Sequence, residues 1–191
     1  MIQYGAMKSN DIVADARVSL VRDLKRSLAE TKERLARVET DFGLLVAHFS
    51  LGMTALRDFE SLPDGVEFRI VDGWNAILKR RNVSKLSSED ISRLKKEYLS
   101  DLGISLAGRE EVGPSPVRTW IVFDGKVANS FRSGSFRVTY TGGSGAHRAD
   151  RMIIDYVNAA KTLGLDVTRI AGETADKDLV KRLSAAGVKI V

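Results

Sequence analysis

The sequence predicts an α/β fold with a mainly parallel central sheet of about five strands, preceded by a long N-terminal helix or coiled coil. Two observations indicate this class. After about residue 65, short apolar runs rich in β-branched and aromatic residues alternate with segments in which apolar residues recur every three or four positions. Before residue 65, one helical periodicity is sustained over several turns. Such alternation is typical of a sheet buried between helices.

The N-terminal helix is expected from about Asn10 to Glu60. Its apolar positions alternate in steps of three and four, which is a heptad pattern: Val21, Leu24, Leu28, Thr31, Leu35, Val38, Phe42, Leu45 and Phe49. A lone helix would leave this stripe in water. The sequence allows a coiled-coil homodimer, parallel or antiparallel, a hairpin near Gly43 that packs on the rest of the chain, or a helix docked in cis as scaffold.

A turn-rich stretch, Ser61-Leu62-Pro63-Asp64-Gly65, marks the predicted boundary between two domains, residues 1–64 and 65–191. Residues 1–64 hold 9 basic and 10 acidic side chains, and residues 65–191 hold 21 and 15. The net positive charge of the chain therefore belongs to the second domain, which favours a polyanionic partner.

The second domain is expected to alternate strands and helices. Strands are predicted at about 67–71, 118–123, 136–140, 166–170 and 188–191. Helices are predicted to begin near Asn75, to be capped by Ser87 or Ser88, to cover about 150–163, and to follow Thr174.

Aspartates follow or flank the predicted strands. Asp72 and Asp124 end apolar runs, Asp150 opens a helix, and Asp176 follows the fourth strand after a short turn. The carboxyl ends of parallel strands meet at one edge of a sheet, so these acids should converge. Carboxylates about 5 Å apart repel by roughly 3 kcal/mol at an effective dielectric near 20, which favours a divalent cation. Singly, each aspartate is equally typical of a helix cap or a turn.

Oxygen ligands without any cysteine favour Mg²⁺ or Mn²⁺ over zinc. The absence of cysteine also excludes disulfides and fits a reducing compartment. The first residues lack the pattern of a signal peptide and no run is apolar enough to span a membrane, so a cytoplasmic protein that does not enter membranes is expected.

Four motifs together resemble the NYN domain, a branch of the PIN-like metal-dependent nucleases, and its bacterial YacP-like members in particular. They span about residues 67–191 in the family's order: Val71-Asp72-Gly73-Trp74-Asn75, Val122-Phe123-Asp124-Gly125, Tyr140-Thr141-Gly142-Gly143 leading to Ala149-Asp150, and Thr174-Ala175-Asp176-Lys177-Asp178-Leu179. The resemblance implies a PIN-like three-layer sandwich. It also implies that Asp72, Asp124, Asp150 and Asp176 are the acidic positions, with Asn75 as a companion amide that holds water or phosphate.

The sequence departs from that family at two places. Trp74 stands where a tyrosine is more usual. Gly172-Glu173 separates the predicted fourth strand from Thr174, so Glu173 or Asp178 remains an alternative to Asp176 at the site.

Basic and aromatic side chains flank these motifs and are candidates for nucleic-acid contact: Trp74, Lys79, Arg80, Arg81, Lys126, His147, Arg148 and Arg151. A solvated helix face is the alternative reading of residues 79–81. The Gly-rich loop 141–146 lacks the spacing of a Walker loop and reads as a linker or a substrate lid.

The function expected from this combination is hydrolysis of RNA phosphodiester bonds by a Mg²⁺- or Mn²⁺-dependent ribonuclease, cutting inside single-stranded or loop RNA. The preference for RNA follows from the resemblance alone. Two alternatives remain: an RNA- or ribosome-binding module without catalysis, and a Mg²⁺-dependent phosphatase, although the Asp-x-Asp pair usual in such phosphatases is absent after the first strand.

Overall fold

The computed structural model describes residues 9–80, 86–105, 116–143 and 147–191, and side chains from residue 18 onward. The chain forms two compact units, residues 1–43 and 44–191, which are described separately. The helix α1, Ser9–Glu60, contributes to both. In the first unit it is the sole element that the structure describes, and its apolar side chains from Val18 to Phe42 are exposed.

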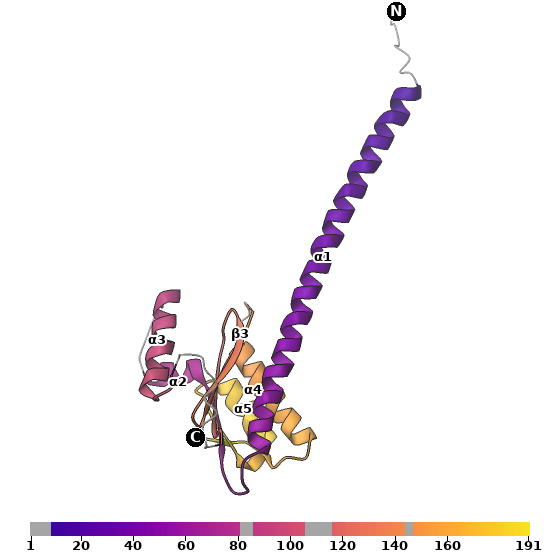
Figure 1. The fold of residues 1–191 in the computed structure, drawn as a ribbon. Helices are drawn as coiled ribbons and strands as arrows, with labels where there is room; N and C mark the ends of the chain where they lie inside the picture. The colour runs from indigo at the N-terminus through magenta and orange to yellow at the C-terminus, as the bar shows by residue number, and fades with distance from the viewer. Residues whose placement is uncertain (1–8, 81–85, 106–115, 144–146) are drawn as a thin grey trace, which may run out of the picture. The chain divides into compact units, whose positions relative to one another are not determined.

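The second unit is an α/β structure built on a six-stranded sheet with the order β3-β4-β2-β1-β5-β6 (Figure 1). The strands are β1 (Phe68–Asp72), β2 (Thr119–Phe123), β3 (Ala128–Ser133), β4 (Phe136–Thr141), β5 (Ile170–Glu173) and β6 (Lys189–Ile190). All neighbouring pairs are parallel except β3 with β4. The predicted α/β class with a mainly parallel sheet and a long N-terminal helix is therefore confirmed.

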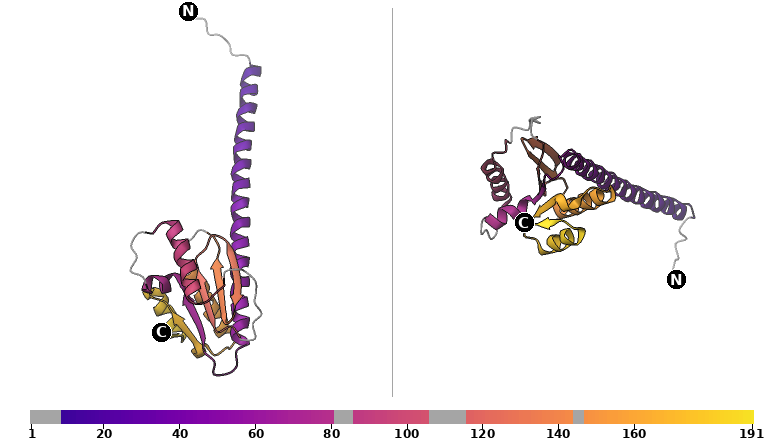
Figure 2. Two further views of the ribbon diagram at one scale, coloured as in Figure 1. Left: turned by 60° about the vertical axis from the view of Figure 1, so that its left-hand side comes forward. Right: turned by 90° about the horizontal axis from the view of Figure 1, so that it is seen from below.

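Helices lie on both faces of this sheet (Figure 2). They are α2 (Gly73–Arg80), α3 (Ser88–Asp101), α4 (Arg148–Thr162) and α5 (Lys177–Ala186). Alternate residues of the central strands enter different cores because side chains of a strand point to opposite faces. Ile70 and Trp120 pack with α4, α5 and the end of α1, whereas Val71 and Ile121 pack with α2 and α3.

The caps of the helices agree with the sequence. Ser87 and Asp90 form a reciprocal capping box at the start of α3. Asp176 caps α5, since its Oδ1 accepts hydrogen bonds from the backbone N–H groups of Asp178, at 2.8 Å, and Leu179, at 2.9 Å. The fixed start of α5 holds this carboxylate in place.

The structure differs from the predicted strands at two places. β3 was not predicted, because Ala128–Ser133 forms an edge strand with few apolar residues; it pairs with β4 through a turn at Gly134, which has a φ of 56°. Residues 167–169 form a 3₁₀ turn capped by Asp166, so the strand runs from Ile170 to Glu173 instead of 166–170. Gly172 and Glu173 therefore belong to β5 and are not an intervening turn.

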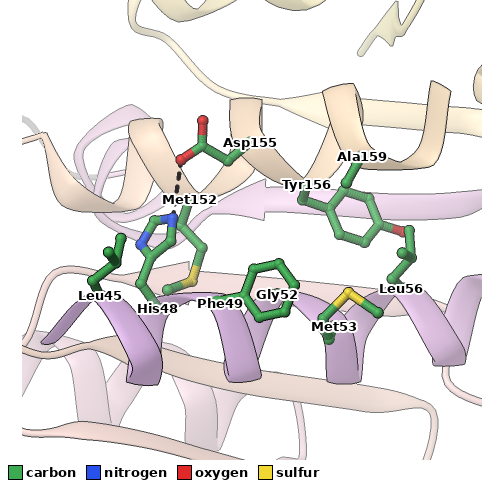
Figure 3. Close-up of a pocket in the computed structure, with 10 residues that line it drawn as sticks. All are labelled: Leu45, His48, Phe49, Gly52, Met53, Leu56, Met152, Asp155, Tyr156 and Ala159. Atoms are coloured by element: carbon green, nitrogen blue, oxygen red, sulfur yellow. Dashed lines mark hydrogen bonds and ion pairs between the residues drawn. The ribbon is translucent and has the colours of Figure 1, made fainter. Parts of the chain in front are cut away.

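The compact unit begins at Leu44, whereas the predicted domain boundary lies near Asp64. The physical reason is packing: Ala55, Leu56, Phe59 and Leu62 are buried in the core beneath α4. About two turns before Ala55, His48 of α1 and Asp155 of α4 point toward each other, and their Nε2 and Oδ2 atoms are 3.0 Å apart (Figure 3). The last part of α1 is thus a structural helix of the α/β unit.

Candidate functional site

The carboxyl ends of β1, β2, β4 and β5 lie along one edge of the sheet because these strands are parallel. From β1 the chain proceeds through β2 to the edge strand β3 and turns back into β4. It then crosses to β5, on the opposite side of β1. The strand order reverses between β1 and β5, and ligands of open α/β sheets bind at such a switch point. Asp72 is the last residue of β1, and Thr174 directly follows β5.

Asp72 is buried, with only 3% of its surface exposed. Its carboxylate accepts hydrogen bonds from the backbone N–H of Asn75 at 3.3 Å, from the Asn75 side-chain amide, and from the hydroxyl of Thr174 at 3.2 Å. Burial raises the pKa of Asp72, the hydrogen bonds from Asn75 oppose that rise, and the charge of Asp150 adds to it. Asn75 therefore orients Asp72, in addition to the contact with water or phosphate predicted for it.

Asp124 follows β2 and reaches across to α4. Its Oδ1 accepts a hydrogen bond of 2.8 Å from the backbone N–H of Ala149, in the first turn of α4. An acidic group is favourable there because the first N–H groups of a helix lack partners within it. The backbone carbonyl of Asp124 accepts a hydrogen bond of 2.6 Å from Nζ of Lys95, on α3.

His147, Asp150 and Asp176 form a cluster at the same edge. Each offers one ligand atom, and these three atoms lie within 4.8 Å of one another. His147 Nδ1 is 2.9 Å from Asp150 Oδ2. His147 precedes α4 in a left-handed conformation with a φ of 59°, and it is the one non-glycine residue with positive φ among those described. Such a conformation is costly for a residue with a Cβ, and it is common at functional sites.

The predicted aspartates act electrostatically on Asp72 and on His147. The charge of Asp150 contributes to the raised pKa of Asp72. The pKa of His147 is raised by its hydrogen bond with Asp150 and by that residue's charge, and further by the charges of Asp176 and Asp124. Asp72 and Asp124 themselves lie outside the three-residue ligand cluster.

The ligand cluster can accept a hard divalent cation, since two carboxylates provide oxygen ligands and an imidazole provides nitrogen. Mn²⁺ and Mg²⁺ suit the carboxylates. The imidazole was not predicted as a ligand, and Zn²⁺ also accepts a set of nitrogen and carboxylate ligands. With His147 included, the cluster suits Zn²⁺ better than a set of aspartates alone would.

The alternatives to Asp176 occupy different places. The charge of Glu173 acts on Tyr98 of the α2–α3 layer, where it adds to the effect of burial in raising the pKa of that phenol. Asp178 lines the same pocket as Asp176, but it is not in the ligand cluster.

Two pockets flank the acidic edge. One, of about 350 Å³, is lined by the ligand cluster together with Arg151, Asp178, Leu179 and Arg182. The other, of about 530 Å³, lies between α3 and the segment after β2, and its lining includes Lys95, Lys96, Lys126, Asp124 and Tyr140. Each pocket thus combines a site aspartate with cationic side chains.

Lys79 and Arg80 line neither of these two pockets. Lys79 and Arg80 are in the last turn of α2, and the Arg80 guanidinium lies 4.9 Å from the centroid of the Tyr98 ring. Trp74 is half-buried beside the α2–α3 core. Arg81 lies outside the described residues, as do residues 144–146 of the Gly-rich loop.

Gly143 lies close to the side chain of Arg148. Gly143 has a φ of 77°, and a Cβ there would lie 2.7 Å from Nη1 of Arg148. The backbone N–H of Gly143 donates a 2.9 Å hydrogen bond to the carbonyl of Lys126. Within the described part of the chain, the buried Nε of Arg148 makes no hydrogen bond.

Sequence reasoning missed Lys95, Arg182 and the contact between Thr174 and Asp72. Lys95 lies in the helix predicted to be capped by Ser87 or Ser88, but the residue that it contacts, Asp124, is 29 positions away in the chain. A helix was predicted to follow Thr174; the hydroxyl of this residue accepts a hydrogen bond of 3.1 Å from the backbone N–H of Asp176 and donates one to Asp72.

Comparison of the chain with protein-family models, curated proteins and solved structures found no match. Among the described residues, no helix has both the length and the apolar character required to cross a membrane.

Proposed function

We propose that this protein is a metal-dependent ribonuclease of the NYN type, with a PIN-like fold, whose site is the acidic edge of the sheet. The observation that carries the proposal is the convergence of Asp72, Asp124, Asp150 and Asp176, from separate parts of the chain, at the switch point, where two of them are grouped with His147. The motif resemblance supplies the NYN type and the choice of RNA.

We assign each site residue a role in cation binding or in positioning from its contacts. Asp150, Asp176 and His147 would hold the cation, with Asp72 adjacent to Asp150. Asn75 and Thr174 fix the Asp72 carboxylate, and Asp124 fixes the start of α4, which carries Asp150. Bound by these residues, a divalent cation would lower the pKa of a water for in-line attack at phosphorus and would offset the charge that builds on the leaving oxygen.

The cationic side chains around the edge would bind the phosphates on either side of the scissile bond. Arg151 and Arg182 line the pocket of the ligand cluster, and Lys95, Lys96 and Lys126 line the other pocket. A chain of phosphates that follows both pockets passes the acidic edge between them. Single strands suit this path, since exposed bases can stack on an aromatic residue such as Trp74.

The test is hydrolysis of a labelled single-stranded RNA with Mg²⁺, Mn²⁺ or Zn²⁺ in turn, by the wild-type protein and by Asp72→Asn, Asp150→Asn and Asp176→Asn. Each variant should lose at least about a hundredfold in rate, because each removes a charge that holds the cation or supports its ligands. Asp155→Asn is the matched control. It lies on α4 beyond the site, pairs with His48, and should leave the rate unchanged.

Metal binding measured by calorimetry separates the outcomes. Loss of both cleavage and cation binding in the site variants supports the proposal. Equal rates of RNA cleavage by the wild type and the site variants would refute the ribonuclease proposal. RNA that is bound in a metal-dependent manner but stays intact indicates a binding module instead, and hydrolysis of small phosphate esters but not RNA indicates a phosphatase.

A further inference from the structure

The heptad seam of α1 is exposed along its whole length. We define the seam as Val21, Leu24, Leu28, Thr31, Leu35, Val38, Phe42, Leu45 and Phe49. The apolar members are exposed by 50 to 68%. A contiguous apolar stripe of this length marks an interaction surface, and a heptad stripe fits another heptad stripe.

The charges on α1 separate into two groups. On the outer face, away from the seam, Arg26 pairs with Asp23 and Arg37 pairs with Glu33 within the helix. Beside the seam, position e of the heptad carries Lys25, Lys32 and Glu39, and position g carries Arg34 and Asp41. In the described part of the chain, Lys32, Glu39, Arg34 and Asp41 make no ion pair, so these four remain available to a partner helix.

An antiparallel pair of α1 helices satisfies all four of these charges at one register. In antiparallel coiled coils, e residues face e residues and g residues face g residues. When Leu28 lies against Leu45 of a second copy, Lys32 faces Glu39 of that copy and Arg34 faces its Asp41. The twofold symmetry repeats both contacts, so four opposite-charge pairs form and no like-charge pair does.

Shifting that register by one heptad in either direction introduces like-charge pairs. One shift places Lys32 and Arg34 against their own counterparts, although Lys25 then faces Glu39, and the other places Glu39 and Asp41 against their own counterparts. A parallel, in-register pair forms fewer ion pairs, because g then faces the following e: Arg34 meets Glu39, while Lys32 and Asp41 face uncharged residues. The charge pattern thus favours one orientation and one register.

The sizes of the seam side chains favour the same antiparallel register. It places Phe42 against Thr31 and Phe49 against Leu24, so each aromatic ring meets a smaller side chain. A parallel pair would instead stack Phe42 on Phe42 and Thr31 on Thr31. Layers that combine large and small side chains fill a helix interface more evenly.

We infer that α1 binds a second copy of this chain as an antiparallel coiled coil over about residues 21–49, in the register that sets Leu28 against Leu45. Leu45 and Phe49 also line an apolar groove of about 270 Å³ beside Met152 of α4 (Figure 3). Leu24 and Leu28 of the second copy meet these two residues and cover the mouth of that groove.

The natural absence of cysteine permits a direct test of orientation. Leu28→Cys and Leu45→Cys variants of the full chain are treated with a short bis-maleimide, alone and mixed. The antiparallel register predicts linked dimers in the mixture and none with Leu28→Cys alone, since residues 28 of the two copies are about 17 residues, or about 25 Å, apart along the rod. Linkage of Leu28→Cys to itself overturns the proposed orientation.

Charge exchange tests the register, with the dimer dissociation constant measured by sedimentation equilibrium. Lys32→Glu should weaken the dimer roughly tenfold, because two attractive pairs become repulsive. The exchange K32E/E39K should restore it in the antiparallel register. A parallel pair would stay weakened, because the exchange puts a positive charge at position 39 against Arg34. Arg22→Glu, on the outer face, is the matched control and should change nothing.

Circular dichroism of each variant checks that α1 stays helical. A wild-type chain that remains monomeric at every concentration, with α1 helical, overturns the inference. So does a K32E/E39K chain that dimerises no better than Lys32→Glu. Neither result bears on the ribonuclease proposal, because the four aspartates of that site lie outside α1.

Discussion

The Thr174 hydroxyl, at the end of β5, donates a hydrogen bond of 3.2 Å to the Asp72 carboxylate, at the end of β1. The two residues are 102 positions apart in the chain and lie on the two strands where the strand order reverses. Thr174 also accepts a hydrogen bond from the backbone N–H of Asp176. One hydroxyl therefore fixes the position of Asp72 relative to the start of α5, and so relative to the carboxylate of Asp176.

Asp72 should make the metal-free protein less stable as the pH rises. Burial raises its pKa in the folded protein, so the folded state binds a proton more tightly than the unfolded state does. The resulting stability is present below the unfolded pKa of about 3.9 and is lost as the pH rises through the raised value. In thermal unfolding with a chelator, Asp72→Asn should match the wild type near pH 4 and exceed it at about pH 7.5. Parallel pH profiles for the two proteins would contradict this.

His147 should titrate above the usual histidine range when no metal is present. The Asp150 carboxylate, through its hydrogen bond and its charge, raises the pKa of the His147 imidazole. The stability from this pair is present below pH of about 6.5 and is lost as the pH rises through the raised value. Asp150→Asn should return the pKa toward the usual value, which NMR of the ring protons measures.

The chain has two histidines, so assignment of these signals is simple. His48→Gln leaves the His147 signal alone in the spectrum. Asp155→Asn, which removes the partner of His48, is the control and should not move the His147 titration. A His147 pKa that is the same in Asp150→Asn and in the wild type would show that the contact does not persist in solution.

Lys95 should contribute to RNA binding through the pocket beside Asp124. Its Nζ lies 5.2 Å from the centroid of the Phe123 ring and 5.8 Å from that of Tyr140, and burial lowers the pKa of this ammonium group. If Lys95 meets one phosphate, Lys95→Met should reduce the slope of log affinity against log salt by about 0.7 for a single strand. Lys161→Met, in the last turn of α4, is the control. An unchanged slope in Lys95→Met would exclude a phosphate contact.

Much of the fold could be predicted because local patterns coincide with the global structure. Asp72 and Asp124 end or follow strands whose apolar runs are evident, and the box formed by Ser87 and Asp90 has its usual spacing. Asp176 caps the start of α5, where aspartate is a preferred residue. These signals depend on residues within a few positions of one another.

The remainder depends on contacts between distant residues. The seam residue Phe49 and the core residue Phe59 belong to the same helix, so the sequence does not reveal where α1 enters the core. His147 joins the ligand cluster through a left-handed backbone conformation that an ordinary histidine does not signal. Lys95 reaches the site only through the crossing of α3 over the end of β2.

Gly73 should tolerate no side chain, although it lies in a helix. It begins α2 directly after Asp72, and a Cβ at this position would lie 2.4 Å from the Phe123 ring. That ring is fully buried and stacks on Tyr140 at 5.6 Å, so it cannot move easily. Gly73→Ala should therefore lower the free energy of unfolding by about 1–3 kcal/mol.

Gly52→Ala provides the matched comparison, measured by urea unfolding at the same pH. Gly52 also lies within a helix, but no heavy atom would come within 4 Å of a new Cβ. Alanine is the better helix former by about 1 kcal/mol, so this variant should be more stable than the wild type. The two substitutions make the same chemical change with opposite expected signs, because only Gly73 is in contact with a ring. A Gly73→Ala protein as stable as Gly52→Ala would show that β1, α2 and Phe123 are not packed as described, and the position of Asp72 would have to be revised with them.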